Sequence, residues 1–144
     1  MIIYNKKQKH YLKYGGYEMA SKMLHTCIRV KDLDKSLKFY KQALGLVETR
    51  RRDYPEYKFS LVYLSDKEDG YEVELTYNYD QEKPYDLGNG FSHIAVGVED
   101  IEAERERHIS LGYEVTPMKG LSDGAATYYF VTDPDGYKVE VIKL

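Results

Sequence analysis

The sequence is poor in the residues that build cross-linked or membrane-bound proteins. It holds one cysteine, four prolines and no tryptophan among 144 residues. A single cysteine excludes an internal disulfide framework and a cysteine-based zinc finger. No apolar run approaches the length of a membrane span, and the lysine-rich start lacks the continuous apolar stretch of a secretory signal. These absences make the cytoplasm the expected compartment.

The chain also lacks an excess of positive charge. It carries 21 Lys and Arg against 24 Asp and Glu, a net charge of −3. Without a basic field, neither nucleic acid nor a membrane surface is an expected partner. The length suffices for one domain with a real core. The 16 tyrosines can line a polar cavity as well as fill that core.

What the chain does contain is an internal repeat. Residues 25–33 and 93–101 share the order His, apolar alternation, Val, charged residue, Asp, aliphatic residue. Residues 71–75 and 137–141 share the pattern Tyr-x-Val-Glu-aliphatic, and the interval from His to Glu is nearly equal in both copies. A repeat of this length is usually one supersecondary unit stacked on its twin.

Each copy has the pattern of a strand, a helix and three more strands. Alternation predicts strands, and helical spacing between Asp32 and Gly45 predicts a capped helix. In the first copy we expect strands at 24–30, 46–52, 58–64 and 71–77 around a helix from 32 to 44. In the second copy we expect strands at 91–98, 113–117, 127–132 and 137–143 and a helix at 99–111.

The repeat divides the chain into modules. Module 1 covers about 23–80, residues 81–90 form a linker, and module 2 covers 91–144, so that 23–144 is expected to be one domain. Residues 1–22 lie outside both copies and show no clean period. Two interpretations are open for them: a genuine extension, ordered or disordered, or translated leader before a true start at Met19 or Met23.

One histidine and one glutamate stand at matching positions in each module. Because strand side chains alternate between faces, His25 and Glu74 share a face opposite their aliphatic neighbours, as do His93 and Glu140. Any one of them alone fits an ordinary polar residue lining a cavity. Four in symmetric positions favour a divalent metal such as Ni, Co, Mn or Zn. A position left open for water would point to catalysis.

Four stretches carry a family resemblance. Residues 24–30, 73–78, 92–95 and 133–140 closely resemble glyoxalase I, a member of the vicinal-oxygen-chelate superfamily, and the similarity runs from about residue 23 to the end. The resemblance implies an α+β fold, in which two βαβββ modules form a cupped eight-stranded mixed sheet with the helices outside.

The same resemblance implies an activity. It is the metal-dependent isomerisation of the methylglyoxal–glutathione hemithioacetal to S-D-lactoylglutathione, by proton transfer through a metal-bound enediolate, which detoxifies methylglyoxal. The protein would be a homodimer with one divalent metal per site, Ni²⁺ favoured and Co²⁺ or Zn²⁺ possible, and with glutathione as co-substrate.

The resemblance also implies a role for each site residue. The metal ligands would be His25, Glu74, His93 and Glu140. Glu140 would be the principal base, with Glu74 as its catalytic counterpart. Arg29 and Asn78 would hold the γ-glutamyl end of glutathione, and His93 would also contact the substrate. Each of Arg29 and Asn78 lies four residues after a ligand and therefore on the ligand's face of its strand.

Two departures from the family pattern leave the thiol open. Residues 88–92 lack an Arg that some relatives carry there. Relatives often place a Lys near the glycine end of glutathione, in the loop before the final hairpin. The nearest match to that Lys here is Asp123, with Lys119 just upstream. Another low-molecular-weight thiol is therefore an alternative. So is another metalloenzyme of the superfamily (an epimerase, thiol transferase or dioxygenase), or a non-enzymatic binding module on the same fold.

Three further residues have simple interpretations. Cys27 shares the face of His25 and is expected to line the cavity as a small apolar residue. His108 falls outside the repeat frame and is expected to be solvated. Arg107, with its charged neighbours, is expected on the exposed face of the second helix.

Overall fold

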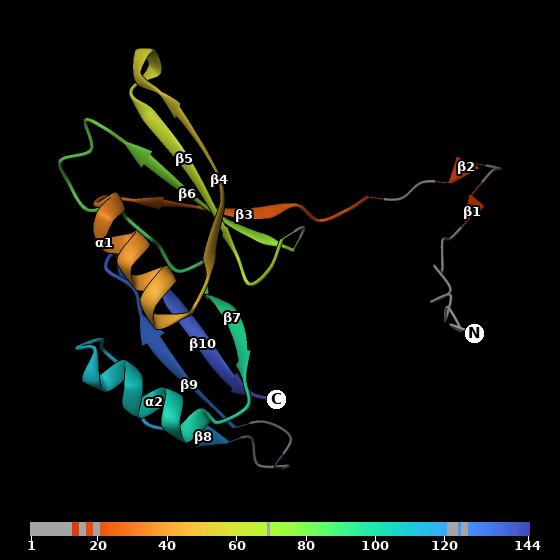
Figure 1. The fold of residues 1–144 in the computed structure, drawn as a ribbon, viewed down its shortest axis with the longest axis vertical. Coiled ribbons are helices and arrows are strands. Elements are labelled where there is room, and N and C mark those ends of the chain that lie inside the picture. Colours follow the sequence, from red (N-terminus) through yellow and green to blue (C-terminus); the bar gives the residue numbers. More distant parts are fainter. Residues whose placement is uncertain (1–12, 15–16, 19–20, 69, 121–123, 125–126) are drawn as a thin grey trace.

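The computed structural model describes residues 13–14, 17–18, 21–68, 70–120, 124 and 127–144. The expectations for residues 1–22 fall mostly outside these ranges. Within them, a short antiparallel pair joins β1 (Lys13–Tyr14) and β2 (Tyr17–Glu18). The rest of the structure is two similar modules, drawn from orange to green and from teal to blue in Figure 1. No helix in the described part of the chain is both long and apolar enough to cross a membrane.

Module 1 is a four-stranded sheet with a helical segment after its first strand. Its elements are β3 (His25–Val30), α1 (Leu33–Lys38), the π-helical turn η1 (Phe39–Ala43), β4 (Val47–Tyr54), the 3₁₀ turn η2 (Pro55–Tyr57), β5 (Phe59–Ser65) and β6 (Glu72–Asn78). The strand order is β3-β6-β5-β4. Only the β3–β6 pair is parallel, and this pair carries the first histidine and the first glutamate.

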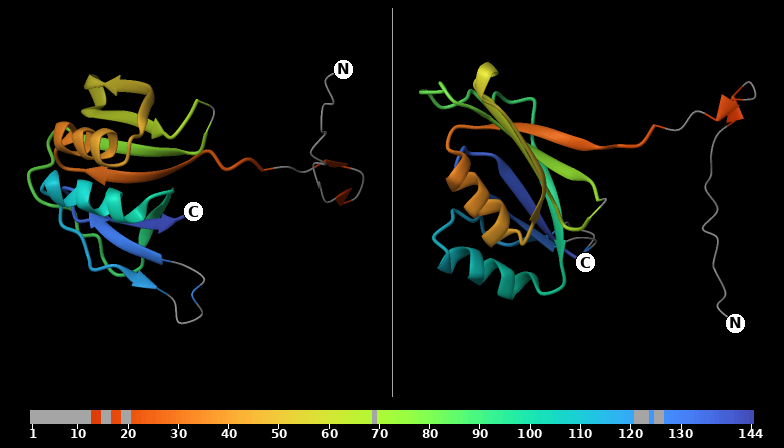
Figure 2. Two further views of the ribbon diagram at one scale, coloured as in Figure 1. Left: turned by 60° about the horizontal axis from the view of Figure 1, so that its bottom comes forward. Right: turned by 45° about the horizontal axis from the view of Figure 1, so that its top comes forward.

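Module 2 repeats the arrangement. Its elements are β7 (His93–Val98), α2 (Ile101–Ser110), β8 (Lys119–Gly120), β9 (Thr127–Thr132) and β10 (Lys138–Lys143). The order β7-β10-β9-β8 matches module 1 strand for strand, with β7 and β10 parallel and the others antiparallel. Figure 2 shows the two modules packed one against the other.

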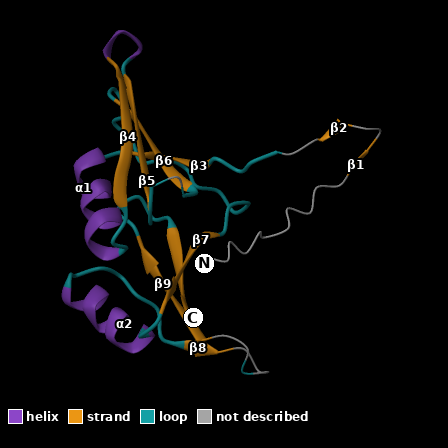
Figure 3. Ribbon diagram, turned by 45° about the vertical axis from the view of Figure 1, so that its right-hand side comes forward, coloured by secondary structure: helices purple, strands orange, loops and turns teal. Residues whose placement is uncertain are grey.

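The predicted fold class is confirmed: an α+β fold of two βαβββ modules with the helices outside. Figure 3 shows both helices on one side and the strands on the other. The eight strands are divided between two separately hydrogen-bonded four-stranded sheets. In the described chain, β3 and β7, the two strands that carry histidines, are each the edge of a sheet. An edge strand leaves half of its backbone groups free to pair elsewhere.

Local signals set the ends of the helices, and Asp32 and Gly45 act as predicted. Asp32 Oδ1 accepts the backbone N–H of Lys35 at 3.1 Å, and Asp100 Oδ1 accepts that of Ala103 at 3.0 Å. These N-caps satisfy donors that have no partner within the helix. Gly45 follows the first helical segment with φ +67°, a left-handed conformation that favours glycine.

The strand predicted at 113–117 is not formed. Val115 makes only an isolated bridge to Val131, and the edge strand β8 begins later, at Lys119. Thr116 N still donates to Phe130 O at 2.9 Å, so the segment follows the sheet edge without completing a ladder. Pro117 explains the break, because proline has no backbone N–H to donate.

Burial contradicts the expectation for His108. Its side chain was expected in solvent but is fully buried. His108 Nε2 donates to the Ala43 carbonyl at 2.8 Å, which leaves Nδ1 to accept the Tyr129 hydroxyl at 2.8 Å. Arg107 likewise donates to the carbonyls of Gln42 and Ala43. Helix α2 therefore satisfies the free carbonyls at the end of η1, an inter-module contact that helical periodicity cannot reveal.

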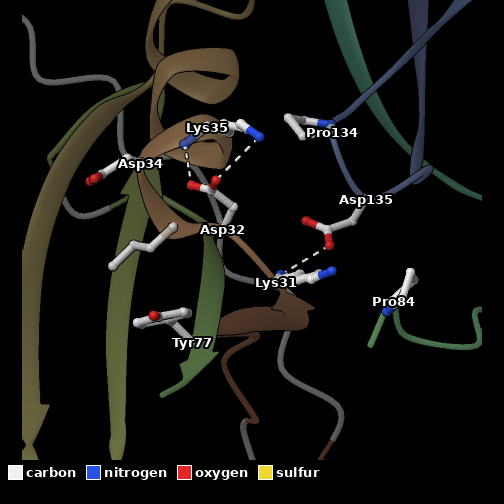
Figure 4. Close-up of a pocket in the computed structure, with 9 residues that line it drawn as sticks. Lys31, Asp32, Asp34, Lys35, Tyr77, Pro84, Pro134 and Asp135 are labelled. Carbon is white, nitrogen blue, oxygen red and sulfur yellow. Dashed lines mark hydrogen bonds and ion pairs between the residues drawn. The ribbon is translucent and has the colours of Figure 1, made fainter. Parts of the chain in front are cut away.

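The hairpin at 133–136 makes the reciprocal contact from module 2 to module 1. Asp133 is buried and accepts the Tyr40 hydroxyl at 3.0 Å and the Tyr137 N–H at 2.8 Å. Burial raises the pKa of Asp133 to about 6, although these hydrogen bonds oppose the shift. Asp135 Oδ1 accepts the Lys31 N–H at 2.9 Å. These two residues, together with Asp32 and Lys35, line a cavity of about 650 Å³ (Figure 4).

Candidate metal centre

The first histidine and glutamate meet on the β3–β6 pair. Cys27 is the register partner of Glu74, so His25 lies diagonally from Glu74 across two parallel strands. His25 Nε2 and Glu74 Oε2 are 3.1 Å apart. The flanking residues Val73 and Leu75 are buried in the core. The period of the strand thus directs the glutamate to the other face, as predicted.

The second pair repeats this geometry on β7 and β10. Ala95 is the register partner of Glu140, which places His93 diagonally from the glutamate as in module 1. His93 Nε2 and Glu140 Oε2 are also 3.1 Å apart. Both histidine side chains are 33% exposed, so an ion can reach them from the same side as the glutamate oxygens.

The spacing of each pair fits two ligands of one metal ion. Nitrogen and oxygen donors lie about 2.1 Å from a divalent metal, so two donors at right angles are separated by about 3.0 Å. The observed 3.1 Å in both modules matches that separation. Each His–Glu pair is therefore suited to be half of an N2O2 donor set, with the imidazole nitrogens and carboxylate oxygens that Ni, Co and Zn accept.

The structure brings the residues together as two pairs and leaves the pairs apart. In the described ranges no group of three or more His, Cys, Asp or Glu could hold one ion. The reason is the division of the strands, because each pair belongs to its own sheet. We refer to His25 with Glu74 as half-site 1 and to His93 with Glu140 as half-site 2.

Half-site 1 has a polar lining. Glu74 Oε1 accepts the Thr76 hydroxyl at 3.0 Å, and the Cys27 thiol lies 3.2 Å from the same hydroxyl. Burial raises the pKa of Glu74, but the polar side chains of Tyr63, Cys27 and Thr76 outweigh it and leave the pKa below its usual value. Burial and the Glu74 charge raise the pKa of the Cys27 thiol, so Cys27 stays neutral, as expected of a lining residue.

Half-site 2 has an apolar lining. Phe130 is the cross-strand partner of Glu140, and its ring meets His93 edge to face at 5.5 Å. Ala95 and Ile142 stand where half-site 1 has Cys27 and Thr76. The Ser92 hydroxyl lies 2.7 Å from His93 Nδ1, which orients the ring so that Nε2 faces Glu140.

Arg29 and Asn78 line one cavity of about 440 Å³ beside half-site 1. They lie at the C-terminal ends of β3 and β6, and Thr76 borders both the cavity and Glu74. Asn78 Nδ2 donates to the Tyr85 hydroxyl at 2.9 Å. Sequence reasoning placed Arg29 and Asn78 on this face but missed Tyr85, which comes from the linker and carries no periodic signal.

The loop near the predicted glycine end of the thiol is only partly described. Lys119, at the start of β8, is exposed. Asp123 lies outside the described residues. In the described part of module 2, Gly97 and Leu144 stand at the positions that match Arg29 and Asn78, so neither of those side-chain donors is repeated there. A Cβ at Gly97 would come within 2.4 Å of Leu144 Cδ2.

Comparisons with known proteins identify the family of the chain. The family model for the glyoxalase/bleomycin resistance protein/dioxygenase superfamily matches residues 22–141. The lactoylglutathione lyase of Haemophilus influenzae is 46% identical over 124 residues, which cover 84% of this chain and 91% of that protein.

Solved structures give the same result. Glyoxalase I from Zea mays superposes with a TM-score of 0.79 at 37% identity over 84% of this chain, which spans only 44% of the maize chain. The trypanothione-dependent glyoxalase I of Leishmania major superposes with a TM-score of 0.75 at 37% identity, covering 86% of this chain and 87% of that one. The chain therefore belongs to the glyoxalase/bleomycin resistance protein/dioxygenase superfamily and, within it, to the glyoxalase I family.

Proposed function

We propose that the protein is a metal-dependent lactoylglutathione lyase that converts the hemithioacetal of methylglyoxal and glutathione to S-D-lactoylglutathione. The observation that carries this proposal is the pair of half-sites with matching donor geometry, in which a histidine nitrogen and a glutamate oxygen are 3.1 Å apart. The lactoylglutathione lyase of Haemophilus influenzae, similar over most of its length, supports the same activity. A single free thiol suits a reducing cytoplasm as the place of action.

The metal would be held by His25, Glu74, His93 and Glu140. Their N2O2 donor set leaves room for water or substrate on a six-coordinate ion, for which Ni²⁺ is the expected choice and Co²⁺ and Zn²⁺ the alternatives. When bound, the ion would act as a Lewis acid that stabilises negative charge on the substrate oxygens.

A second copy of the chain would complete the site. Half-sites 1 and 2 of one chain do not form a common cluster in the described residues. The histidine-bearing strands β3 and β7 are sheet edges, and Leu24 and Phe91, just before them, are large apolar residues left 60% and 42% exposed. In a two-fold homodimer, half-site 1 of one subunit would face half-site 2 of its partner, which gives two equal sites.

The proton is moved by a glutamate. Glu140 takes the proton from the carbon that bears sulfur, the bonding electrons move toward the substrate oxygens, and a proton returns to the neighbouring carbon. Glu74 is its counterpart on the other side of the site. The isomerisation needs no redox cofactor, because one carbon is oxidised as its neighbour is reduced.

Arg29 and Asn78 would hold the acidic end of the thiol. An arginine and an amide in one cavity supply donors for a carboxylate and an acceptor for an ammonium group. Glutathione is the proposed thiol, with another low-molecular-weight thiol as the alternative. The trypanothione-dependent relative from Leishmania major makes that alternative concrete.

Metal removal and replacement test the activity. The chelated protein is expected to be inactive with methylglyoxal and glutathione, and Ni²⁺ is expected to restore more activity than Zn²⁺. Turnover by the metal-free protein, or no turnover with any divalent metal, would contradict the proposal. Repeating the assay with trypanothione identifies the thiol.

Mixing two inactive variants tests the shared site. Glu74→Gln and Glu140→Gln are each expected to be nearly inactive. If each site combines two subunits, a mixed dimer has one site with both defects and one with none. Random exchange would then restore about a quarter of the wild-type sites. No gain in activity after verified exchange would place each site within one chain.

A further inference from the structure

The cavity beside half-site 1 has polar side chains that come from outside module 1. Besides Arg29 and Asn78, the described residues that line it include Gln81 and Tyr85 of the linker. Tyr85 also borders a second cavity of about 360 Å³, and Arg29 is the other residue that the two cavities share. The half-buried Tyr85 therefore lies where both cavities meet the arginine.

Sheet register leaves the amide of Asn78 in need of an acceptor. Arg29 is the register partner of Thr76, so it lies diagonally from Asn78, as the histidine lies from the glutamate in half-site 1. On its other side, the cross-strand partner of Asn78 is Phe59. A phenyl ring offers no polar atom and a guanidinium offers only donors, so neither neighbour can accept the N–H groups of the amide.

The linker supplies that acceptor. Asn78 Nδ2 donates to the Tyr85 hydroxyl at 2.9 Å. Because the amide is planar, this bond directs Nδ2 toward the linker and leaves Oδ1 as an acceptor on the other side of the group. The terminal torsion of an asparagine is otherwise broad, so the contact with Tyr85 is what gives the amide one orientation.

The linker is itself anchored before and after Tyr85. The Gln81 N–H donates to the Asn78 carbonyl at 3.2 Å, and further along the chain Leu87 packs against the hydrophobic core. Two fixed contacts thus hold the backbone that presents Tyr85 to the cavity. Such pre-organisation lowers the cost of ordering the tyrosine and the amide when a ligand binds.

We propose that Tyr85 is a positioning residue that orients the Asn78 amide and so makes the site selective for thiols with a free α-amino acid end, such as the γ-glutamyl end of glutathione. The inference rests on the proposed function. Arg29 donates to the α-carboxylate, and Oδ1 of Asn78 accepts from the α-ammonium group. A fixed acceptor discriminates against an analogue without the matching donor, because the acceptor then stays unpaired.

Two thiols that differ only in the α-amino group test this role. Glutathione and its deamino analogue, glutaryl-cysteinylglycine, are each combined with methylglyoxal, and KM is measured for both hemithioacetals. In the wild type, KM is expected to be at least about tenfold higher for the deamino analogue, because a hydrogen bond to a charged group is missing.

Tyr85→Phe is expected to reduce this preference. KM for the glutathione hemithioacetal should rise about fivefold with kcat unchanged, while KM for the deamino analogue stays constant, because that thiol has no ammonium group for Oδ1. A merely structural loss would raise both values. Equal effects on the two thiols in Tyr85→Phe, or equal KM values in the wild type, would overturn the inference.

A control and a double variant identify the route of the effect. Tyr57→Phe is the matched control, because Tyr57 is 72% exposed at the tip of the β4–β5 hairpin. If Tyr85 acts through Asn78, adding Tyr85→Phe to Asn78→Ala is expected to change neither KM. A further loss of the preference for glutathione in that background would contradict the positioning role.

The two proposals fail in different ways. Isothermal titration of the metal-loaded protein with each thiol measures the preference without turnover. If lyase activity is absent but glutathione binds more tightly than the deamino analogue, and Tyr85→Phe removes that difference, only the proposed function fails. If the lyase is active and Tyr85→Phe keeps the full preference, only the role of Tyr85 fails. Neither binding nor turnover with both thiols would overturn both proposals.

Discussion

Half-sites 1 and 2 are the same construction with different surroundings. Strand register places a histidine diagonally from a glutamate in both, and the donor atoms are 3.1 Å apart in both. Around Glu74 the neighbours are polar, and around Glu140 they are apolar. Backbone pairing therefore sets where a ligand lies, while side chains from neighbouring strands set what that ligand can do.

The modules also differ in their second pair of residues on the ligand face. Module 1 carries Arg29 and Asn78 beside a cavity, whereas module 2 carries Gly97 and Leu144 packed against each other. Side-chain donors for a polar ligand therefore stand beside half-site 1 and are not repeated at the matching positions of module 2. The duplicated scaffold repeats the His–Glu pair but not the residues next to it.

The largest expected effect comes from replacing the two glutamates separately. Glu140→Gln is expected to lower kcat by about 10³-fold with metal still bound, because general base catalysis is typically worth that much. Glu74→Gln is expected to act mainly by weakening metal binding. Measuring kcat and metal content of both variants, with exposed Glu106→Gln as control, sharpens the comparison. Equal losses of kcat in the two variants, both fully occupied by metal, would contradict the expected difference between the two glutamates.

The next effect is a pH dependence of stability that belongs to module 2. Burial raises the pKa of Asp133 from 3.8 to about 6, so the folded protein binds this proton more tightly than the unfolded chain does. The ionised carboxylate therefore costs stability above its folded pKa, and the cost disappears as the pH falls toward 3.8. The full difference is about 3 kcal/mol.

Asp133→Asn measures this cost. Relative to the variant, the free energy of unfolding of wild type is expected to rise by about 1 kcal/mol as the pH is lowered from about 7 to about 5. Denaturant titrations at both pH values check it. The equivalent hairpin of module 1 is less buried, since Tyr71 there is 43% exposed whereas the matching Tyr137 of module 2 is 9% exposed. The pH dependence is therefore expected from the hairpin of module 2. A constant difference across this range would contradict the buried-carboxylate explanation.

Two buried helix residues give a separate effect on stability. Tyr40 and His108 stand the same number of residues after the N-cap aspartates of their helices, and each reaches into the other module. His108→Phe is expected to lower the free energy of unfolding by about 2 kcal/mol, because it leaves the Tyr129 hydroxyl without its partner. Tyr40→Phe is expected to cost about 1 kcal/mol, since Asp133 keeps two backbone donors. Chemical denaturation measures both losses, and a larger loss in Tyr40→Phe than in His108→Phe would contradict the prediction.

The smallest effect is confined to substrate affinity. Arg29→Ala is expected to raise KM for the hemithioacetal about tenfold with little change in kcat, because one charge-assisted hydrogen bond is lost. Arg52→Ala is the matched control, since Arg52 is exposed on β4, at the opposite edge of the same sheet. An unchanged KM in Arg29→Ala would place the acidic end of the thiol elsewhere.

Most of the fold was readable from local pattern, and the exceptions have physical causes. Asp32 and Gly45 mark helix ends through contacts within a few residues, so their signals survive in any context. The strand at 113–117 failed because Pro117 interrupts a ladder that alternation alone would continue. His108 was misjudged because its partners, Ala43 and Tyr129, lie far away along the chain.

The candidate site was likewise only partly predictable from the sequence. Strand period assigned His25, Glu74, His93 and Glu140 to the correct faces, and the repeat paired them by analogy. Tyr63 and Tyr85 were not found, because a residue across a sheet or in a linker has no fixed offset from the residue it supports. That the four candidate ligands form two half-sites within the described chain follows from sheet pairing, which no single strand encodes.

The sequence by itself determined the duplication, the strand–helix order and the face of every ligand, because these depend on side-chain periods that act over a few residues. Only the tertiary structure decided that each glutamate meets its histidine at 3.1 Å, that Tyr63 faces one glutamate and Phe130 the other, and that β3 and β7 are sheet edges. The physical reason is that hydrogen-bonded register between distant strands, rather than local propensity, fixes which side chains share a site.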